Sequence, residues 1–249
     1  MRWLVVIVVL AGCDRVFGLG DPYEDARPSD VAIDMPRPQA DAPADALDDA
    51  PEMIPQPLVH YRFDNSYAEA GTGMPATCTN SGGGGCAFVA GVYGEALQLD
   101  GSSIGQVTLP SLPPVFTVMV WAKGSGVVYD LQQLLTQSPD VWWLDMSNGI
   151  TFKSRSGSTV QTSSVSRPVE TWTNIAVTYD GVDQQLYVDT SLNVVTPVGA
   201  ISYGGNRVVC IGCRMGSSTT YLSGAIDDFY VFDTALTQAE IAAYANTAH

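Results

Sequence analysis

The chain has 249 residues and is strongly acidic, with 26 aspartate and glutamate residues against 11 lysine and arginine residues and a formal net charge of −15 at pH 7. The sequence has no basic patch that would release counterions from a phosphate backbone, which argues against a nucleic-acid partner. Beyond the N-terminal residues, no apolar run is long enough to cross a bilayer as a helix.

The first thirteen residues have the pattern of an export signal. Arg2 supplies a positive charge, an apolar run extends to Leu10, and two small residues precede Cys13. Such a short run suits the central region of a signal peptide. The segment ending at Cys13 resembles the lipobox of bacterial lipoproteins, whose cysteine is diacylated and becomes the mature N-terminus. We expect a signal peptide over 1–12 and a lipid-anchored position in the bacterial cell envelope, periplasmic or surface-exposed. The alternative is an ordinary secretory signal with a chance cysteine.

Residues 13–57 are predicted to be a disordered tether. Between 14 and 57 there are eleven acidic and three basic residues, and proline, alanine and aspartate dominate. Such a segment cannot bury enough apolar surface to offset the entropy lost on ordering. A flexible chain of this length spans roughly 35–40 Å. The alternative is an acidic interaction tail, but no aromatic or repeated motif follows Tyr23 to act as a recognition element.

Residues 58–249 are predicted to form one all-β domain. Short segments with β-type composition are separated by turns rich in Gly, Asp, Asn and Ser. The clearest alternation of apolar and polar residues lies in 116–122 and 173–179, and 172–189 has the pattern of a hairpin. Further strands are expected at 58–63, 95–99, 106–109, 141–146, 149–154, 158–163, 207–212 and 225–232.

One helix is expected at the end of the chain. Thr237 and Glu240 have the spacing of a capping box, which would open a helix over 241–245. Many short strands and almost no other helical pattern predict a two-sheet antiparallel sandwich with a short C-terminal helix.

The motifs of this domain resemble the LamG-like jelly-roll domains of the concanavalin A-like lectin/glucanase superfamily. They occur in the family's order over essentially all of 58–249, and the last of them is the most specific. The segments that carry the resemblance are Tyr61–Asn65, Gly94–Ser102, Phe116–Trp121, Trp172–Gly181 with its return Leu186–Asp189, and Gly224–Phe232 followed by Ala235–Thr237. The resemblance implies that the sandwich is a jelly roll.

The resemblance also implies a structural calcium ion. Concanavalin A-like domains often bind calcium through an aspartate of the C-terminal strand, with oxygens from the first strand and a nearby turn. The matching residues here are Asp227, Asp64 or its neighbour Asn65, and the turn at Gly101. Such hard oxygen ligands suit calcium. The alternative is that Asp227 and the aspartate after it only break the strand register at a bulge.

Catalytic residues are sparse in 58–249. Glycosidases of this fold use two carboxylates placed across a sugar, commonly as Glu-x-Asp-x-Glu. The domain's four glutamates do not form such a pattern, and a nucleophilic site would depend on His60 alone. A histidine on a strand is more often a hydrogen-bonded structural residue. The sequence therefore predicts that the protein is not an enzyme.

Aromatic residues are the candidates for ligand contact. Trp142 and Trp143 are adjacent on a predicted strand and must point to opposite faces, so one belongs to the core. The other either packs against the domain or forms a platform for a sugar ring. Tyr129 and Tyr221, with Tyr203, lie in or beside predicted loops, where binding residues concentrate.

Four cysteines remain after Cys13, which fits disulfides in an exported chain. Cys78 and Cys86 flank a glycine-rich loop and are the favoured pair. Cys210 and Cys213 would be roughly 10 Å apart on an extended strand, so they pair only if the intervening glycine begins a turn. Pairings of 78 with 210 and 86 with 213, or of 78 with 213 and 86 with 210, stay open, as does a four-cysteine zinc site.

The sequence as a whole predicts a lipid-anchored envelope protein. Its LamG-like domain would bind a carbohydrate or protein ligand at the cell surface. The alternatives are a structural or adhesive module without a small-molecule site and, as the weakest reading, a glycan-active enzyme.

Overall fold

The structure is a computed structural model, and residues 52–249 form a unit of their own, separate from residues 1–51. The predicted signal peptide, Cys13 and nearly all of the predicted tether lie outside the described residues. No helix in the described part of the chain is long and apolar enough to cross a bilayer. The described residues are 54–71, 73–80, 83–131, 141–147, 149–156, 159–166, 170–201, 203, 205–214 and 221–247.

Eight antiparallel strands form the first sheet, sheet A. Their spatial order is β13-β12-β11-β6-β15-β4-β3, and β1 pairs with β15 as well. The bounds are β1 (Val59–Tyr61), β3 (Phe88–Ala90), β4 (Glu95–Asp100), β6 (Phe116–Ser125), β11 (Thr173–Tyr179), β12 (Asp183–Val188), β13 (Ser191–Pro197) and β15 (Ser223–Phe232).

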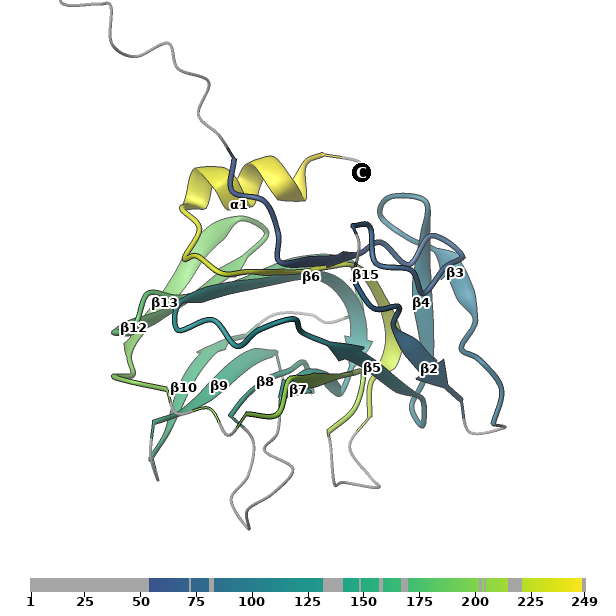
Figure 1. Ribbon diagram of the computed structural model, residues 1–249, viewed down its shortest axis with the longest axis horizontal. Coiled ribbons are helices and arrows are strands. Elements are labelled where there is room, and N and C mark those ends of the chain that lie inside the picture. Colours follow the sequence, from purple (N-terminus) through teal and green to yellow (C-terminus); the bar gives the residue numbers. More distant parts are fainter. Residues whose placement is uncertain are drawn as a thin grey trace, which may run out of the picture. The chain divides into compact units, whose positions relative to one another are not determined.

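Seven antiparallel strands form the second sheet, sheet B. Their order is β10-β9-β8-β7-β14-β5-β2. The two sheets lie face to face, as Figure 1 shows for β6 and β15 above β7 to β10. The bounds are β2 (Thr77–Thr79), β5 (Ile104–Thr108), β7 (Val127–Leu131), β8 (Trp142–Asp145), β9 (Ile150–Ser156), β10 (Thr159–Val165) and β14 (Val208–Ile211). This arrangement confirms the predicted all-β jelly-roll sandwich.

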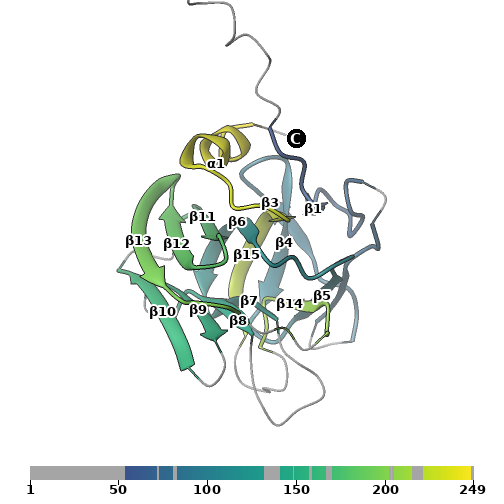
Figure 2. The same ribbon diagram turned by 60° about the vertical axis from the view of Figure 1, so that its left-hand side comes forward.

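The main core lies between the two sheets, where alternate residues of each strand point inward. Val118 and Val120 of β6 and Ile175 and Val177 of β11 belong to it, as the period-two pattern predicts. Polar residues join the sheets near β10 and β12. The buried Gln184 accepts a hydrogen bond from Ser154 at 2.6 Å and donates one to Ser163 at 2.7 Å. Figure 2 shows β12 and β13 beside β9 and β10 on this side.

The helix α1 (Gln238–Ala245) covers the outer face of sheet A. Thr237 accepts the Glu240 N–H and the Glu240 carboxylate accepts the Thr237 N–H, so the predicted capping box is confirmed. Ile241 and Tyr244 pack on the outward residues of sheet A, which form a second apolar cluster containing Met119, Ala176, Tyr187, Tyr230 and Phe232. The outer face of sheet A is therefore largely occupied by the chain itself.

The described part of the chain begins at Ile54, before the predicted start of the domain at residue 58. Ile54 to Pro57 were assigned to the tether, but the Tyr244 hydroxyl of α1 donates to the Pro55 carbonyl. In addition, the Leu58 N–H donates to the Val231 carbonyl at 2.7 Å. These contacts extend the domain by four residues.

Four strands were not predicted. β2 and β3 have three residues each, too few to show a period of two. β13 is an edge strand with largely exposed side chains, so it lacks the apolar alternation of a buried strand. β7 carries a register shift between Val127 and Tyr129, which breaks its alternation.

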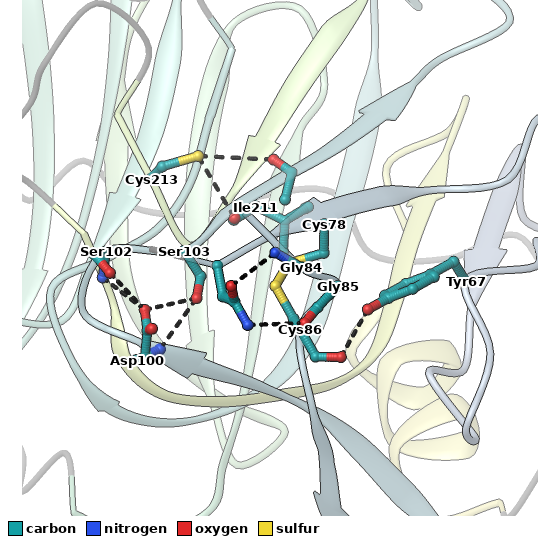
Figure 3. The surroundings of a disulfide bond; sticks show 12 residues. Tyr67, Cys78, Gly84, Gly85, Cys86, Asp100, Ser102, Ser103, Ile211 and Cys213 are labelled. Carbon is teal, nitrogen blue, oxygen red and sulfur yellow. Dashed lines mark hydrogen bonds between the residues drawn. A yellow bond between two sulfur atoms is a disulfide. The ribbon is translucent and has the colours of Figure 1, made fainter. Parts of the chain in front are cut away.

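The described residues contain two disulfides, and both link residues close in the sequence. Cys78 and Cys86 have Cα atoms 5.5 Å apart, which confirms the favoured pair. Figure 3 shows Tyr67 beside this bond, where its hydroxyl donates to the Cys86 carbonyl at 2.8 Å. The Cα atoms of Cys210 and Cys213 are also 5.5 Å apart. Gly212 has a φ of +72° and turns the chain there, which is the condition that this pairing required.

Candidate functional site: the outer face of sheet B

β8 places Trp142 and Trp143 on opposite faces of sheet B, as expected for adjacent strand residues. Trp142 points into the main core and is only 2% exposed. Its ring centroid lies 5.9 Å from that of Phe116 and 6.4 Å from that of Phe152. The prediction of Trp142 as a ligand-contact residue is therefore wrong, because packing between the sheets covers its ring.

Trp143 lies on the outer face of sheet B, where two cations cover its ring. Lys153 is directly opposite it on β9, with Nζ 5.5 Å from the ring centroid. Arg214, which follows β14, has Cζ 5.5 Å from the same centroid. Trp143 is consequently only 7% exposed. An indole covered in this way is a support for two cations rather than the exposed sugar platform considered from the sequence.

The strand register defines the residues of this face. Directly paired residues in antiparallel strands share one face, and Trp143 belongs to a row that crosses the whole of sheet B. Thr162, Gln106 and Thr77 in this row are exposed. Taken from β10 to β2, the row is Thr162, Lys153, Trp143, Asp130, Cys210, Gln106 and Thr77. We call the outward face that contains this row the outer face of sheet B.

The Cys210–Cys213 disulfide positions one end of this site. The chain leaves β14 through the Gly212 turn, where the Gly212 N–H donates to the Val128 carbonyl at 2.7 Å. A Cβ atom on Gly212 would lie 2.3 Å from a methyl carbon of Leu99, so another residue would disturb the turn. The turn delivers Arg214 to the Trp143 ring.

Tyr129 and Tyr221, the two tyrosines predicted as ligand contacts, lie in different surroundings. Tyr221 is half-buried and forms an isolated β-bridge with Cys213, which places it next to Arg214 in the structure. Tyr129 lies within β7, two residues before the end of that strand. The side chain of Tyr129 lies outside the described residues.

A second polar site forms where β15 changes partners. β15 pairs with β4 up to Ile226 and with β1 from Phe229, and its register shifts between Asp227 and Tyr230. Asp228, with a φ of +46°, lies in this bulge. The sequence left open that Asp227 and Asp228 break the strand register at a bulge, and such a bulge is present.

Asp227 caps the turn that follows β3. Its Oδ2 accepts the N–H groups of Val92 at 2.8 Å and Tyr93 at 3.1 Å. Gly91 permits this approach, because a Cβ atom there would lie 2.4 Å from the same oxygen. Asp227 is fully buried, and burial raises the pKa of its carboxyl from 3.8 to about 7. The nearby charge of Asp228 raises this pKa further, whereas the two backbone N–H groups lower it.

Asp64 approaches the same turn from β1. Its Oδ1 accepts the Glu95 N–H at 2.8 Å and lies 2.1 Å from where a Cβ atom on Gly94 would be. The structure therefore brings Asp64 and Asp227 to one turn, although 163 positions separate them in the sequence. Asn65, beside Asp64, is exposed and has a φ of +50°.

The described residues match the expected calcium site only in part. Asp227 Oδ1 is buried and has no hydrogen-bond partner among them, which leaves one hard acceptor for a cation. Gly101 is a wrong member of the predicted set. It lies beside Ser223, four residues from Asp227 along β15 and so about 13 Å away. Within the described ranges, no three His, Cys, Asp or Glu side chains lie close enough together to hold a metal ion.

The structure also shows a cavity of about 450 Å³ beside α1. His60 on its wall has Nε2 2.7 Å from Asp228 Oδ1, and its ring stacks on Tyr230 with centroids 4.0 Å apart. This confirms the interpretation of His60 as a hydrogen-bonded strand residue. The pairing of His60 with Asp228 was missed, because it depends on the register of β1 against β15.

The carboxylate of Glu69, on the wall of the same cavity, accepts hydrogen bonds from the backbone of a loop. One of its carboxylate oxygens accepts the His60 N–H at 2.9 Å, and the other accepts the N–H groups of Gly71 and Gly73 at 2.8 Å each. These three hydrogen bonds give the Glu69 carboxylate a structural role. The cavity therefore does not present Glu69 in the manner of a general acid.

The two stacked antiparallel sheets, with α1 on the outer face of sheet A, define a jelly-roll sandwich domain. Residues 100–242, more than half of the chain, match the Laminin_G_3 family, described as the concanavalin A-like lectin/glucanases superfamily. The chain belongs to this family.

Similar proteins include the human adhesion G-protein coupled receptor D1, which is 33% identical over 94 residues. These residues are 36% of this chain and 11% of the receptor, so the chain spans about a tenth of that relative's length.

Solved structures share the fold at low sequence identity. One is domain 4 of AbnA, a GH43 extracellular arabinanase from Geobacillus stearothermophilus, with a TM-score of 0.63 and 20% identity over 77% of this chain and 98% of that one. Another is the binding domain of botulinum neurotoxin serotype D/C, with a TM-score of 0.61 and 13% identity over 78% of this chain and 52% of that one. At these identities the likeness shows the fold alone.

Proposed function

We propose that the domain is a carbohydrate-binding module that uses the outer face of sheet B. The observation that carries this proposal is the asymmetry of the sandwich. α1 and its apolar cluster occupy the outer face of sheet A, whereas the row that crosses sheet B includes the exposed polar residues Thr162, Gln106 and Thr77. Exposed hydroxyl and amide side chains of this kind can donate and accept hydrogen bonds with sugar hydroxyls. Neighbours of the fold support this class of ligand: AbnA domain 4 was solved with arabinotriose, and cell entry of botulinum neurotoxin type C depends on two ganglioside molecules.

We also propose that the domain has no glycosidase activity of its own. Glu240 caps α1, and three backbone N–H groups hold Glu69. Asp227 and Asp64 likewise bond the turn after β3. A retaining or inverting mechanism needs a pair of carboxylates across a substrate, and these acids serve the fold instead.

The glycan proposal predicts binding without hydrolysis. The 52–249 unit, which carries both sheets and both disulfides, should bind at least one glycan class on a glycan array. Thr162→Tyr and Gln106→Tyr, exposed positions of the row, should lower binding by about tenfold or more through steric block. Leu192→Tyr, an exposed position of sheet A, is the matched control and should bind normally. Reducing-end release should stay at the level of a heat-treated sample.

Failure of every glycan to bind, with capture of a protein ligand instead, would favour the adhesive alternative. A botulinum neurotoxin DC binding domain was solved in complex with rat synaptotagmin II, so the fold also accommodates protein partners. Loss of protein capture in the two tyrosine variants would assign that role to the same face.

The N-terminal pattern supports a lipid anchor, which we propose attaches the domain to the bacterial cell envelope. Mass spectrometry of the mature protein should find an acylated Cys13 at the N-terminus. Cys13→Ser should be unlipidated and should move from the detergent-soluble membrane fraction to the precursor or soluble fraction. An unmodified N-terminus at another residue in the native protein would refute the anchor.

We further propose that a calcium ion stabilises the turn after β3. The support is the buried Asp227 Oδ1, which lacks a partner among the described residues, and the presence of Asp64 at the same turn. A bound calcium ion would supply positive charge to these carboxylates and would hold β1 and β15 against the turn.

A further inference from the structure

The cavity beside α1 has walls from three segments of the chain. These are the entry segment Ile54–Pro57, the loop Glu69–Gly71 and the end of α1. Tyr230, an outward residue of sheet A, lines the cavity as well. The cavity therefore lies on the outer face of sheet A, and the outer face of sheet B is on the other side of the sandwich. Its volume of about 450 Å³ falls within the roughly 300–1,000 Å³ of small-molecule sites.

Hydrogen bonds hold the three segments in place. The Tyr244 hydroxyl donates to the Pro55 carbonyl, which ties the entry segment to α1. The Ala70 N–H donates to the His60 carbonyl at 2.8 Å, and the His60 N–H donates to the Glu69 carboxylate at 2.9 Å. These two bonds tie the loop to β1. Because the walls are fixed by the fold itself, a ligand would bind without the cost of ordering them.

The wall of the cavity carries groups of both charges. Arg62 and Glu69 both line it, and the carboxylate of Asp228 lies next to it, paired with the ring of His60. An anionic ligand would meet the carboxylates of Glu69 and Asp228, and a cationic ligand would meet the guanidinium group of Arg62. The wall therefore favours a neutral ligand over an ion of either sign.

The accessible groups of the wall suit a ligand with many hydroxyl groups. Gln56, Arg62 and Thr247 are exposed and offer amide, guanidinium and hydroxyl groups that can hydrogen-bond with sugar hydroxyls. Ile54 is 44% exposed, and with the half-buried Pro57 it offers an apolar surface for the C–H groups of a sugar ring. The cavity thus combines an apolar side with neutral and charged hydrogen-bonding groups.

We propose that this cavity is a second carbohydrate-binding site, which takes a short neutral oligosaccharide. The site is separate from the one proposed on the outer face of sheet B. Because the two sites lie on opposite faces of the sandwich, one short oligosaccharide cannot occupy both. A domain with both sites joins two polysaccharide chains. This consequence rests on the proposed function, whereas the cavity site itself does not.

NMR titration of the ¹⁵N-labelled 52–249 unit tests the proposal. The probes are arabinotriose, cellotriose and galactotriose, which are neutral, and trigalacturonic acid as a charged counterpart. At least one neutral probe should shift the amide resonances of Arg62, Gly71 and Thr247 around the cavity. Trigalacturonic acid should bind there at least about fivefold more weakly than the best neutral probe. Shifts of Thr162 and Gln106 report separately on the outer face of sheet B.

Variants assign the binding to the cavity. Ala70→Tyr places a large side chain at its wall and should weaken binding there by about tenfold or more, whereas Arg62→Gln should weaken it by about fivefold. Ala68→Tyr is the matched control, because Ala68 is exposed in the same segment but does not line the cavity, and it should bind normally. Thermal melts must show that the variants remain folded. Ala70→Tyr should also stop the unit from clustering the matching polysaccharide, as measured by turbidity.

The outcomes separate this proposal from the proposed function. Shifts confined to the outer face of sheet B would refute the cavity site and leave the proposed function intact. Shifts confined to the cavity would support the cavity site and refute both the site on sheet B and the joining of two chains. Tighter binding of trigalacturonic acid than of every neutral probe at the cavity would refute the neutral ligand. Binding of no probe at either place would refute both proposals.

Discussion

The native chain is expected to lose stability as the pH rises from about 4 to about 7, and Asp227→Asn is expected to remove this loss. Burial raises the pKa of Asp227 from 3.8 to about 7, so the folded state holds this proton more tightly than the unfolded chain. The contribution is complete below the unfolded pKa and is lost as the pH rises through the folded pKa. The loss should be on the order of 4 kcal/mol. Urea denaturation in EDTA at a series of pH values measures it.

Asparagine is a suitable replacement, because its amide oxygen can still accept the N–H groups of Val92 and Tyr93. The difference between native and variant stability isolates Asp227 from the other carboxyl groups. Asp233→Asn, at an exposed position of the same region, should keep the native pH dependence. A native pH profile that Asp227→Asn leaves unchanged would contradict this assignment.

Calcium binding should favour the ionised form of Asp227, whereas burial favours its protonated form. At pH 7.5, where Asp227 is largely ionised, millimolar calcium should raise the melting temperature of the native unit and not that of Asp227→Asn. A ligand at 100 times its Kd stabilises by about 2.7 kcal/mol. Identical native melts in calcium and in EDTA would remove the metal and leave Asp227 as a cap for the turn.

Gly224→Ala is expected to lower the free energy of unfolding by at least about 3 kcal/mol, or to prevent folding. Gly224 of β15 lies opposite Gly124 of β6, at the centre of sheet A. A Cβ atom there would be 1.8 Å from the Lys123 carbonyl oxygen and 2.8 Å from the Gly124 Cα. The obstructing atoms are backbone, so the two strands would have to separate. Urea midpoints or, for an insoluble variant, the soluble yield measure the effect.

Gly84→Ala is the matched control for this prediction. Gly84 lies in the loop between Cys78 and Cys86, and its added Cβ atom would meet only the Asn80 side chain, at 3.8 Å. We expect a change within about 0.5 kcal/mol. Equal stability of the native, Gly224→Ala and Gly84→Ala proteins would mean that β6 and β15 are not packed as closely as described.

Features with a short-range cause were predictable from the sequence. The capping box of Thr237 and Glu240 and the Cys78–Cys86 disulfide each involve residues less than ten positions apart. Strands β6 and β11 were predictable because their core-facing residues recur at every second position. The three-residue strands β2 and β3 were not, because their sequences are too short to carry that signal.

The candidate sites were only partly predictable. Trp142 and Trp143 were known to face opposite ways, but which ring enters the core depends on the packing of β8 against β6 and β9. Similarly, the resemblance pointed to Asp227 and Asp64, and the structure places both at one turn. Gly101 was predicted as part of the same site, but it lies beside the start of β15, whereas Asp227 lies further along that strand. Resemblance identifies residues of a motif, whereas distances between motifs come from the fold.

The sequence by itself determined the class of this protein: an all-β domain with a capped C-terminal helix, linked to an acidic N-terminal segment. Alternation, turn residues and caps act over a few positions, and they are legible without the fold. Only the tertiary structure decided that Lys153 and Arg214 meet over Trp143, and that the buried Asp227 has one oxygen with no hydrogen-bond partner in the described part of the chain. These groups come from strands far apart in the chain, and their meeting depends on which strands pair and in which register. Register follows from burying one face of every strand in a common core, so it belongs to the whole domain and to no single segment.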